Sequence, residues 1–183
     1  MEQNVKPVLL NLGCGEDQRP GYINVDAYGG PDVVWDLQEF PYPWEDNSVD
    51  GIVMHHVLEH LPDWWSAFLE CARILKPGGE LHIHVPDESS PSALTYRDHH
   101  HIFSAISFHG IQYSHGQGLP GANSWAKEFE KTVPLAMYDY RRIPYSKYNW
   151  MRYIPGLLPF CADHMRGFIW GQEFHFRKIG DRK

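Results

Sequence analysis

Cysteine is scarce in this chain, and its placement narrows the class of protein. Only three occur, Cys14, Cys71 and Cys161, and no two of them form a CxxC pair. An odd number of scattered thiols is untypical of a secreted disulfide scaffold. We therefore expect a reduced, cytoplasmic protein.

Long apolar runs are missing as well. No stretch approaches the roughly 20 apolar residues that a membrane-spanning helix needs. The first ten residues lack the basic start and apolar run of a signal peptide. Hydrophobic residues nevertheless make up 43% of the 183 positions, which is enough for one core. We predict a single domain over residues 1–183 with no membrane association.

Positive charge is in deficit, because the net charge is −7, and this disfavours a nucleic-acid partner. The deficit is uneven. Residues 141–183 carry nine Lys/Arg and three Asp/Glu, whereas residues 1–140 carry seven and twenty. The basic part is also rich in aromatic residues. It is interpreted either as a solvated basic face beside buried rings, or as a surface for an anionic substrate or partner, including a second copy in a homodimer.

Alternating strand and helix patterns predict an α/β protein. Asp63 is placed to cap a helix over residues 64–75, and the sequence Lys76–Pro77–Gly78–Gly79 ends it. A shorter helical turn is expected over residues 57–61, before Pro62. Apolar runs predict strands over residues 8–12, 22–26, 32–36, 49–54 and 80–85.

The second half of the chain has weaker signals. Two more strands are predicted over residues 132–140 and 168–179, with a helix between them over residues 148–165. That helix should be broken around Pro155–Gly156 and again at Pro159. The glycine-rich stretch 110–121 is expected to be a lid or a long connector.

Two glycines and a carboxylate mark a nucleotide pocket near the N-terminus. Gly13 and Gly15 follow the first strand, where the lack of a side chain lets a ligand approach the backbone. Asp26 ends the second strand, where a carboxylate can accept both hydroxyls of a ribose. Only six residues separate Gly15 from the second strand, which is too short for a crossover helix.

Five motifs in this order resemble those of class I S-adenosylmethionine (SAM) dependent methyltransferases, especially the methyltransferase type 11 group. They are LNLGCG at 10–15, GYINVD at 21–26, DL at 36–37, EDNSVDGIVMHHVLEHL at 45–61 and ARILKPGGELHIHVPD at 72–87. Position 18 is Gln18, not the third glycine of a dinucleotide motif, which favours SAM over NAD.

The resemblance implies a Rossmann-like, seven-stranded, mostly parallel sheet of order 3-2-1-4-5-7-6, with the last strand antiparallel and helices on both faces. Residues 1–88 would form the SAM-binding half, and residues 89–183 the variable substrate and lid part. The product would be S-adenosylhomocysteine. The residues implied in SAM binding are Leu12, Gly13, Cys14, Gly15, Asp26, Asp36, Leu37 and His55.

Among these residues, Asp36 would accept the exocyclic amine of adenine and Leu37 would cover its ring, although Asp36 could equally cap a turn. Cys14 is expected to contribute only its backbone, because no basic neighbour would stabilise a thiolate. His56 and His101 are the candidate catalytic residues, since imidazole titrates near neutral pH. The alternative for each histidine is a packing role.

A run of histidines at 99–101 raises the question of a metal. His109 and His115 follow nearby, but no cysteine or carboxylate accompanies the run at a familiar ligand spacing. We predict no metal here and expect a lid or acceptor-site role, or a solvated loop.

The predicted function is methyl transfer from SAM to a small-molecule acceptor. After the fourth strand the chain reads MHHVLEH, where amino-directed DNA methyltransferases typically carry (Asp/Asn)-Pro-Pro-aromatic, and no Pro-Cys nucleophile motif occurs. Two alternatives stay open. One is a SAM-binding regulatory or scaffold protein without chemistry, and the other is aminopropyl transfer with Asp87–Glu88 at the amine acceptor.

Overall fold

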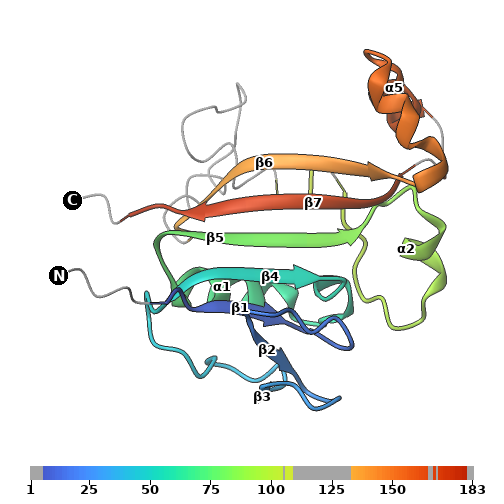
Figure 1. Ribbon diagram of the computed structural model, residues 1–183. Coiled ribbons are helices and arrows are strands. Elements are labelled where there is room, and N and C mark those ends of the chain that lie inside the picture. Colours follow the sequence, from blue (N-terminus) through green and yellow to red (C-terminus); the bar gives the residue numbers. More distant parts are fainter. Residues whose placement is uncertain (1–5, 105, 109–132, 165–166, 168, 181–183) are drawn as a thin grey trace, which may run out of the picture.

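A single mixed sheet organises the computed structural model, which describes residues 6–104, 106–108, 133–164, 167 and 169–180. The strands run in the order β3-β2-β1-β4-β5-β7-β6 (Figure 1). Neighbours from β3 to β5 pair in parallel, and β7 is antiparallel to both β5 and β6. The predicted strand order is therefore confirmed. The strands are β1 Leu9–Leu12, β2 Ile23–Asp26, β3 Val33–Val34, β4 Val49–His55, β5 Leu75–Pro86, β6 Leu135–Pro144 and β7 Ile169–Lys178.

Helix α1 (Trp64–Ile74) packs on the sheet and closes the core. Asp63 caps it as predicted, because its carboxylate accepts a hydrogen bond from the Ser66 amide at 3.0 Å. Phe68 is fully buried and its ring centroid lies 5.3 Å from that of Phe176 on β7. One apolar helix face therefore anchors the parallel and antiparallel parts of the sheet together.

Several predicted boundaries shift. The expected helical turn after β4 is the 3-10 helix η1 (Leu58–His60). Helix α1 ends at Ile74, before the glycines at 78 and 79 that were expected to stop it. Those glycines lie within β5, which starts at Leu75 and carries an irregularity in its pairing with β4. The connection from β1 to β2 contains no helix, as its length predicted.

The break expected at Pro159 was wrong. Helix α5 (Leu157–His164) runs through that position, because Pro159 lies in its first turn, where a missing N–H breaks no intrahelical bond. The break at Pro155–Gly156 is confirmed, since it separates α5 from the 3-10 helix η2 (Ser146–Tyr153).

Beyond the carboxyl ends of β4 and β5 lie the short helix α2 (Pro91–Thr95) and α5 (Figure 1). The predicted lid at residues 110–121 lies outside the described residues. All three cysteines are buried and free. In the described part of the chain, no helix is long and apolar enough to cross a membrane.

Candidate active site

The sheet has a topological switch point between β1 and β4. From β1 the chain moves outward to β2 and β3, and then returns to the other side of β1 as β4. Ligands of open α/β sheets bind beyond the carboxyl ends of the strands at such a point. A cavity of about 300 Å³ lies there, lined by Gly13, Asp26, Ala27, Tyr28, Trp35, Asp36, Leu37, His56, Val57, His60 and Leu61.

Gly13 forms one wall of the cavity for a steric reason. Its φ is +67°, and a Cβ at this position would lie 2.5 Å from Cγ2 of Val57. The amides of Gly13 and Cys14 both donate to the Val25 carbonyl, at 2.8 and 3.0 Å. The turn after β1 is therefore wedged between the end of β2 and the segment after β4.

Asp26 is held in place by two backbone amides. Its Oδ2 accepts from Gly15 at 2.8 Å and its Oδ1 accepts from Tyr28 at 3.1 Å. A carboxylate has about four lone-pair positions, so two hydrogen bonds leave it able to accept two more. Tyr28 is 83% exposed although it lines the cavity, which leaves an aromatic ring free to cover a ligand.

Asp36 and Leu37 form the wall that follows β3. The Asp36 carboxylate accepts from the Gln38 amide at 2.9 Å, so it does cap a turn, as the alternative interpretation held. Its second oxygen stays available to a ligand. The buried Tyr42 hydroxyl donates to the Leu37 carbonyl at 3.1 Å, and burial raises the pKa of that hydroxyl above its usual range. It therefore stays a donor.

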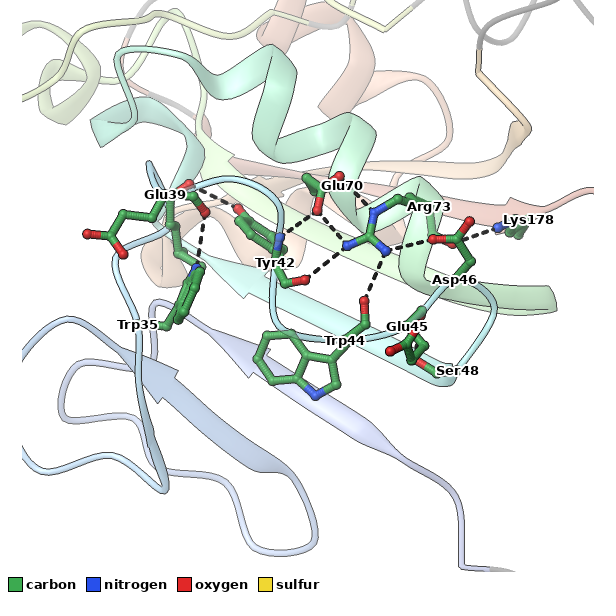
Figure 2. Close-up of polar contacts among 11 residues, drawn as sticks. Trp35, Glu39, Tyr42, Trp44, Glu45, Asp46, Ser48, Glu70, Arg73 and Lys178 are labelled. Atoms are coloured by element: carbon green, nitrogen blue, oxygen red, sulfur yellow. Dashed lines mark hydrogen bonds and ion pairs between the residues drawn. The ribbon is translucent and has the colours of Figure 1, made fainter.

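The segment behind this wall is fastened to α1 by Arg73 (Figure 2). The Arg73 guanidinium donates to Glu70, Asp46 and the carbonyls of Tyr42 and Trp44, at 2.7–3.0 Å. Glu70 also accepts from the Tyr42 amide at 2.6 Å. Hydrogen bonds from Arg73 lower the pKa of the Glu70 carboxyl. One ion-pair network thus fixes the loop that presents Asp36 and Leu37.

His56, which also lines the cavity, belongs to a group of histidines at the end of β4 and on β5. His56 has φ +56°, and its Nδ1 lies 3.0 Å from Oε1 of Glu59, a carboxylate that is only 1% exposed. The His56 amide donates to the His84 carbonyl at 2.9 Å, which ties the segment after β4 to β5. We call His55, His56 and His84 the histidine cluster.

The rings of the histidine cluster lie against one another and against Trp170. Centroid distances are 4.3 Å between His55 and His84, 4.7 Å between His56 and His84, and 4.8 Å between His55 and His56. Burial, with His55 and His56 nearby, lowers the pKa of His84 to about 3. Burial and His56 also lower the pKa of His55. His84 is therefore a neutral imidazole at physiological pH.

The predicted SAM residues divide into two groups. Gly13, Asp26, Asp36 and Leu37 line the cavity together. The remaining four, Leu12, Cys14, Gly15 and His55, are not among its lining residues. Leu12 is a fully buried core residue. Burial of the Cys14 thiol and, to a smaller extent, the nearby Asp26 carboxylate raise the thiol pKa, so Cys14 can contribute its backbone but not a thiolate.

The two candidate catalytic histidines are not equivalent. His56 lines the cavity, whereas His101 does not, and the His101 Nε2 lies 3.0 Å from the Pro62 carbonyl. The predicted amine-acceptor pair also separates, because Asp87 is 2% exposed and accepts from Ser89 while Glu88 faces solvent. Sequence reasoning missed Tyr28 and Trp35, which also line the cavity. Trp35 directly follows β3 and Tyr28 lies two residues after β2, and an aromatic residue just beyond a strand end is the signal that could have found them.

Residues 14–83 match the model of the methyltransferase domain family. A segment of 46 residues, 25% of this chain and 16% of the relative, is 44% identical to 27-O-demethylrifamycin SV methyltransferase of Amycolatopsis mediterranei. Another of 69 residues, 38% of this chain and 24% of the relative, is 39% identical to a "Probable S-adenosylmethionine-dependent methyltransferase" of Mycolicibacterium smegmatis. The chain thus matches a quarter or less of the length of these relatives.

Solved structures resemble this chain over most of its length. A SAM-dependent methyltransferase of Archaeoglobus fulgidus has a TM-score of 0.61 at 13% identity, covering 95% of this chain and 87% of that one. The 1,6-didemethyltoxoflavin-N1-methyltransferase of Burkholderia thailandensis, solved with S-adenosylhomocysteine, has a TM-score of 0.55 at 15% identity, covering 96% and 72%. Such identities show the fold. Residues 14–83 therefore match a methyltransferase domain, and the chain has the fold of solved SAM-dependent methyltransferases.

Proposed function

We propose that the chain transfers the methyl group of SAM to a small-molecule acceptor. Asp26, Asp36 and Leu37, which we call the adenosine side, would hold the ribose and the adenine. The turn at Gly13–Gly15 would carry the methionine part. The cavity would then direct the sulfonium methyl toward the carboxyl ends of β4 and β5.

One observation carries this proposal most strongly. The Asp26 carboxylate stands at the switch point with both oxygens oriented by backbone amides, and it lines the same cavity as Asp36 and Leu37. A ribose needs a carboxylate such as Asp26 to accept its hydroxyls. An adenine needs a hydrogen-bond acceptor such as Asp36 and an apolar side chain such as Leu37 against its ring. The lining supplies both within one cavity of about 300 Å³, which lies at the lower end of the size of ligand pockets.

Methyl transfer from SAM requires little acid–base catalysis from the protein. The sulfonium methyl is already activated, so the main contribution is the alignment of donor and acceptor. His56, with its Nδ1 fixed by Glu59, is the proposed residue at the reacting end, in preference to His101. A small acceptor is supported by the relative named for methylating a demethylrifamycin, and by MHHVLEH in place of a DNA-methyltransferase motif.

Calorimetric titration with SAM and S-adenosylhomocysteine tests the proposal. We expect micromolar binding to the wild type, weakened at least tenfold in Asp26→Ala, since a hydrogen bond to a charged group contributes about 1.5–3 kcal/mol. Asp139→Asn is the matched control, because that carboxylate pairs with Arg141 on β6 and lies outside the cavity lining. Its affinity should equal that of the wild type.

Folded wild-type protein that binds neither ligand would overturn the proposal. Equal weakening in Asp26→Ala and Asp139→Asn would remove Asp26 from the site. SAM binding without acceptor-dependent release of S-adenosylhomocysteine, across a panel of small hydroxyl and amine acceptors, would instead support a regulatory or scaffold role.

A further inference from the structure

The histidine cluster has the composition of a metal site. His55 is the last residue of β4, His56 follows it directly, and His84 comes from the adjacent strand β5, paired with His55. One ring nitrogen from each residue lies within 4.8 Å of the others. Three imidazoles converging from two rigid strands offer neutral nitrogen ligands, which zinc and other first-row transition metals prefer.

His84 is the least explained member without a metal. It is 6% exposed, and neither of its ring nitrogens has a hydrogen-bond partner among the described residues. Gly171 on β7 makes room for this ring, because a Cβ there would overlap His84 Nε2. A buried imidazole without a partner costs free energy unless a ligand satisfies it.

His56 has the second feature of a ligating histidine. Its Nδ1 pairs with the buried Glu59 carboxylate at 3.0 Å, and this arrangement leaves Nε2 for a metal. Metal-bound histidines commonly donate their other N–H to a carboxylate in this way, which fixes the ring and raises its basicity. Glu59 Oε2 also has no hydrogen-bond partner among the described residues.

We propose that His55, His56 and His84 bind one divalent transition-metal ion, with Glu59 orienting His56. Bonds of about 2.0–2.1 Å place the nitrogens of a tetrahedral ion about 3.3 Å apart, so the rings need to approach by at most about 1.5 Å. Three protein ligands leave a fourth position open. Since His56 also lines the cavity, the ion would border the site assigned to SAM and its acceptor.

A second group offers less. Glu59, His60 and His99 also bring their ligand atoms within 4.8 Å of one another. However, the His60 Nδ1 already lies 3.1 Å from the Asp98 carboxylate and 3.2 Å from its carbonyl. The histidine cluster is therefore the stronger site.

The proposal is tested with Co²⁺ on the full chain, freed of any affinity tag and stripped of metal, in the absence of SAM. We expect visible d–d absorption of a low-symmetry Co²⁺ site at one equivalent, displaced by Zn²⁺. His55→Ala and His84→Gln should each weaken Co²⁺ binding at least tenfold, and Glu59→Gln should weaken it 10–100-fold. His82→Ala is the control, since His82 lies on the same strand but contacts His175 and Tyr138.

The outcomes separate cleanly. Absence of Co²⁺ binding up to about 100 µM, or equal affinity in His82→Ala and in folded His55→Ala and His84→Gln, would overturn the proposal. Circular dichroism checks folding, and His55→Ala keeps the test decisive if His84→Gln unfolds. Because no SAM is present, a negative result here leaves the methyltransferase proposal intact, and a failure to bind SAM leaves this one intact.

Discussion

The adenosine side of the cavity and the histidine cluster are neighbours, because His56 lines the same cavity, and they differ in how their polar atoms are satisfied. Asp26 accepts hydrogen bonds from the backbone amides of Gly15 and Tyr28, and Asp36 accepts one from the amide of Gln38. His84 and Glu59 are buried as deeply as core residues, yet each keeps atoms without a partner among the described residues.

This difference separates preorganised polar atoms from polar atoms that are not hydrogen-bonded among the described residues. A carboxylate already oriented by amides can bind a ribose or an adenine without rearranging, which lowers the entropic cost of binding. Buried polar atoms without partners are instead a reservoir of free energy that a ligand can release. We infer that the adenosine side is preorganised for its ligand, and that the polar atoms of the histidine cluster are arranged to bind a further group.

The largest expected effect comes from breaking the support of the adenosine side. Arg73→Ala removes the guanidinium that joins Glu70, Asp46 and two loop carbonyls (Figure 2). Loss of a partly buried, charge-assisted network should lower the free energy of unfolding by about 3 kcal/mol. Urea denaturation measures this value, and SAM titration should show weakened binding as well, since the loop presents Asp36 and Leu37.

Arg177→Ala is the matched control for this prediction. Arg177 pairs with Glu80 at 2.6 Å on the exposed surface, and removal of an exposed pair leaves stability nearly unchanged. If both variants lose the same stability, the Arg73 network is not the support of the adenosine side.

A smaller loss of stability is expected from substitutions in the turn after β1, at Gly13 and Gly15. Gly13→Ala forces a side chain into a positive-φ position and against Val57, and we expect a loss of about 2 kcal/mol. Gly15→Ala meets the same φ restriction, with φ +48°, but nothing lies within 4 Å of its Cβ. Its loss should be about 1 kcal/mol.

Thermal unfolding of the two glycine variants measures the steric part as their difference. The losses from Gly13→Ala and Val57→Ala should sum to more than the loss in the double variant, because the new methyl then has space. Equal losses at Gly13 and Gly15 would show that φ alone, and not the contact with Val57, governs the turn.

The adenosine side was largely readable from the sequence, and the histidine cluster was not. Gly13 and Asp26 each follow an apolar run, and parallel strands bring their carboxyl ends to one edge of a sheet. The strand order was implied by the resemblance to a known family, and five ordered motifs carry that resemblance. Such features are local in the sequence, so a linear pattern contains them.

The histidine cluster depends on pairing that no local pattern records. His84 lies 29 residues after His55, reads as an alternating strand residue, and meets His55 only through the register of β4 and β5. The three consecutive histidines His99–His101 are the more visible pattern in the sequence, and His101 was predicted as a candidate catalytic residue. In the structure the His101 Nε2 lies 3.0 Å from the Pro62 carbonyl. The predicted break at Pro159 was wrong for a related reason. Whether a proline breaks a helix depends on where the helix starts, and α5 starts only two residues before Pro159.

The smallest expected effect is on the pH dependence of stability, through the Glu70 carboxyl that supports the adenosine side. Hydrogen bonds from Arg73 hold the pKa of Glu70 below its ordinary value of 4.5. A carboxyl with a depressed folded-state pKa contributes stability that is present above the unfolded value and is lost as the pH falls through the folded value. Stability should therefore decline as the pH falls below the ordinary carboxyl pKa of 4.5, and Glu70→Gln should flatten this decline while lowering stability at pH 7.

Urea denaturation at several pH values measures the slope, with Glu80→Gln as the control. Arg177 also lowers the pKa of Glu80, but that pair lies on the exposed surface and solvent screens it. We expect the wild-type slope in Glu80→Gln and a shallower one in Glu70→Gln. Since Glu70 holds the Tyr42 amide behind Leu37, acid would then loosen the adenosine side through Glu70. An unchanged slope in Glu70→Gln would show that other carboxylates control the acid response, and that the adenosine side does not owe its rigidity to this ion pair.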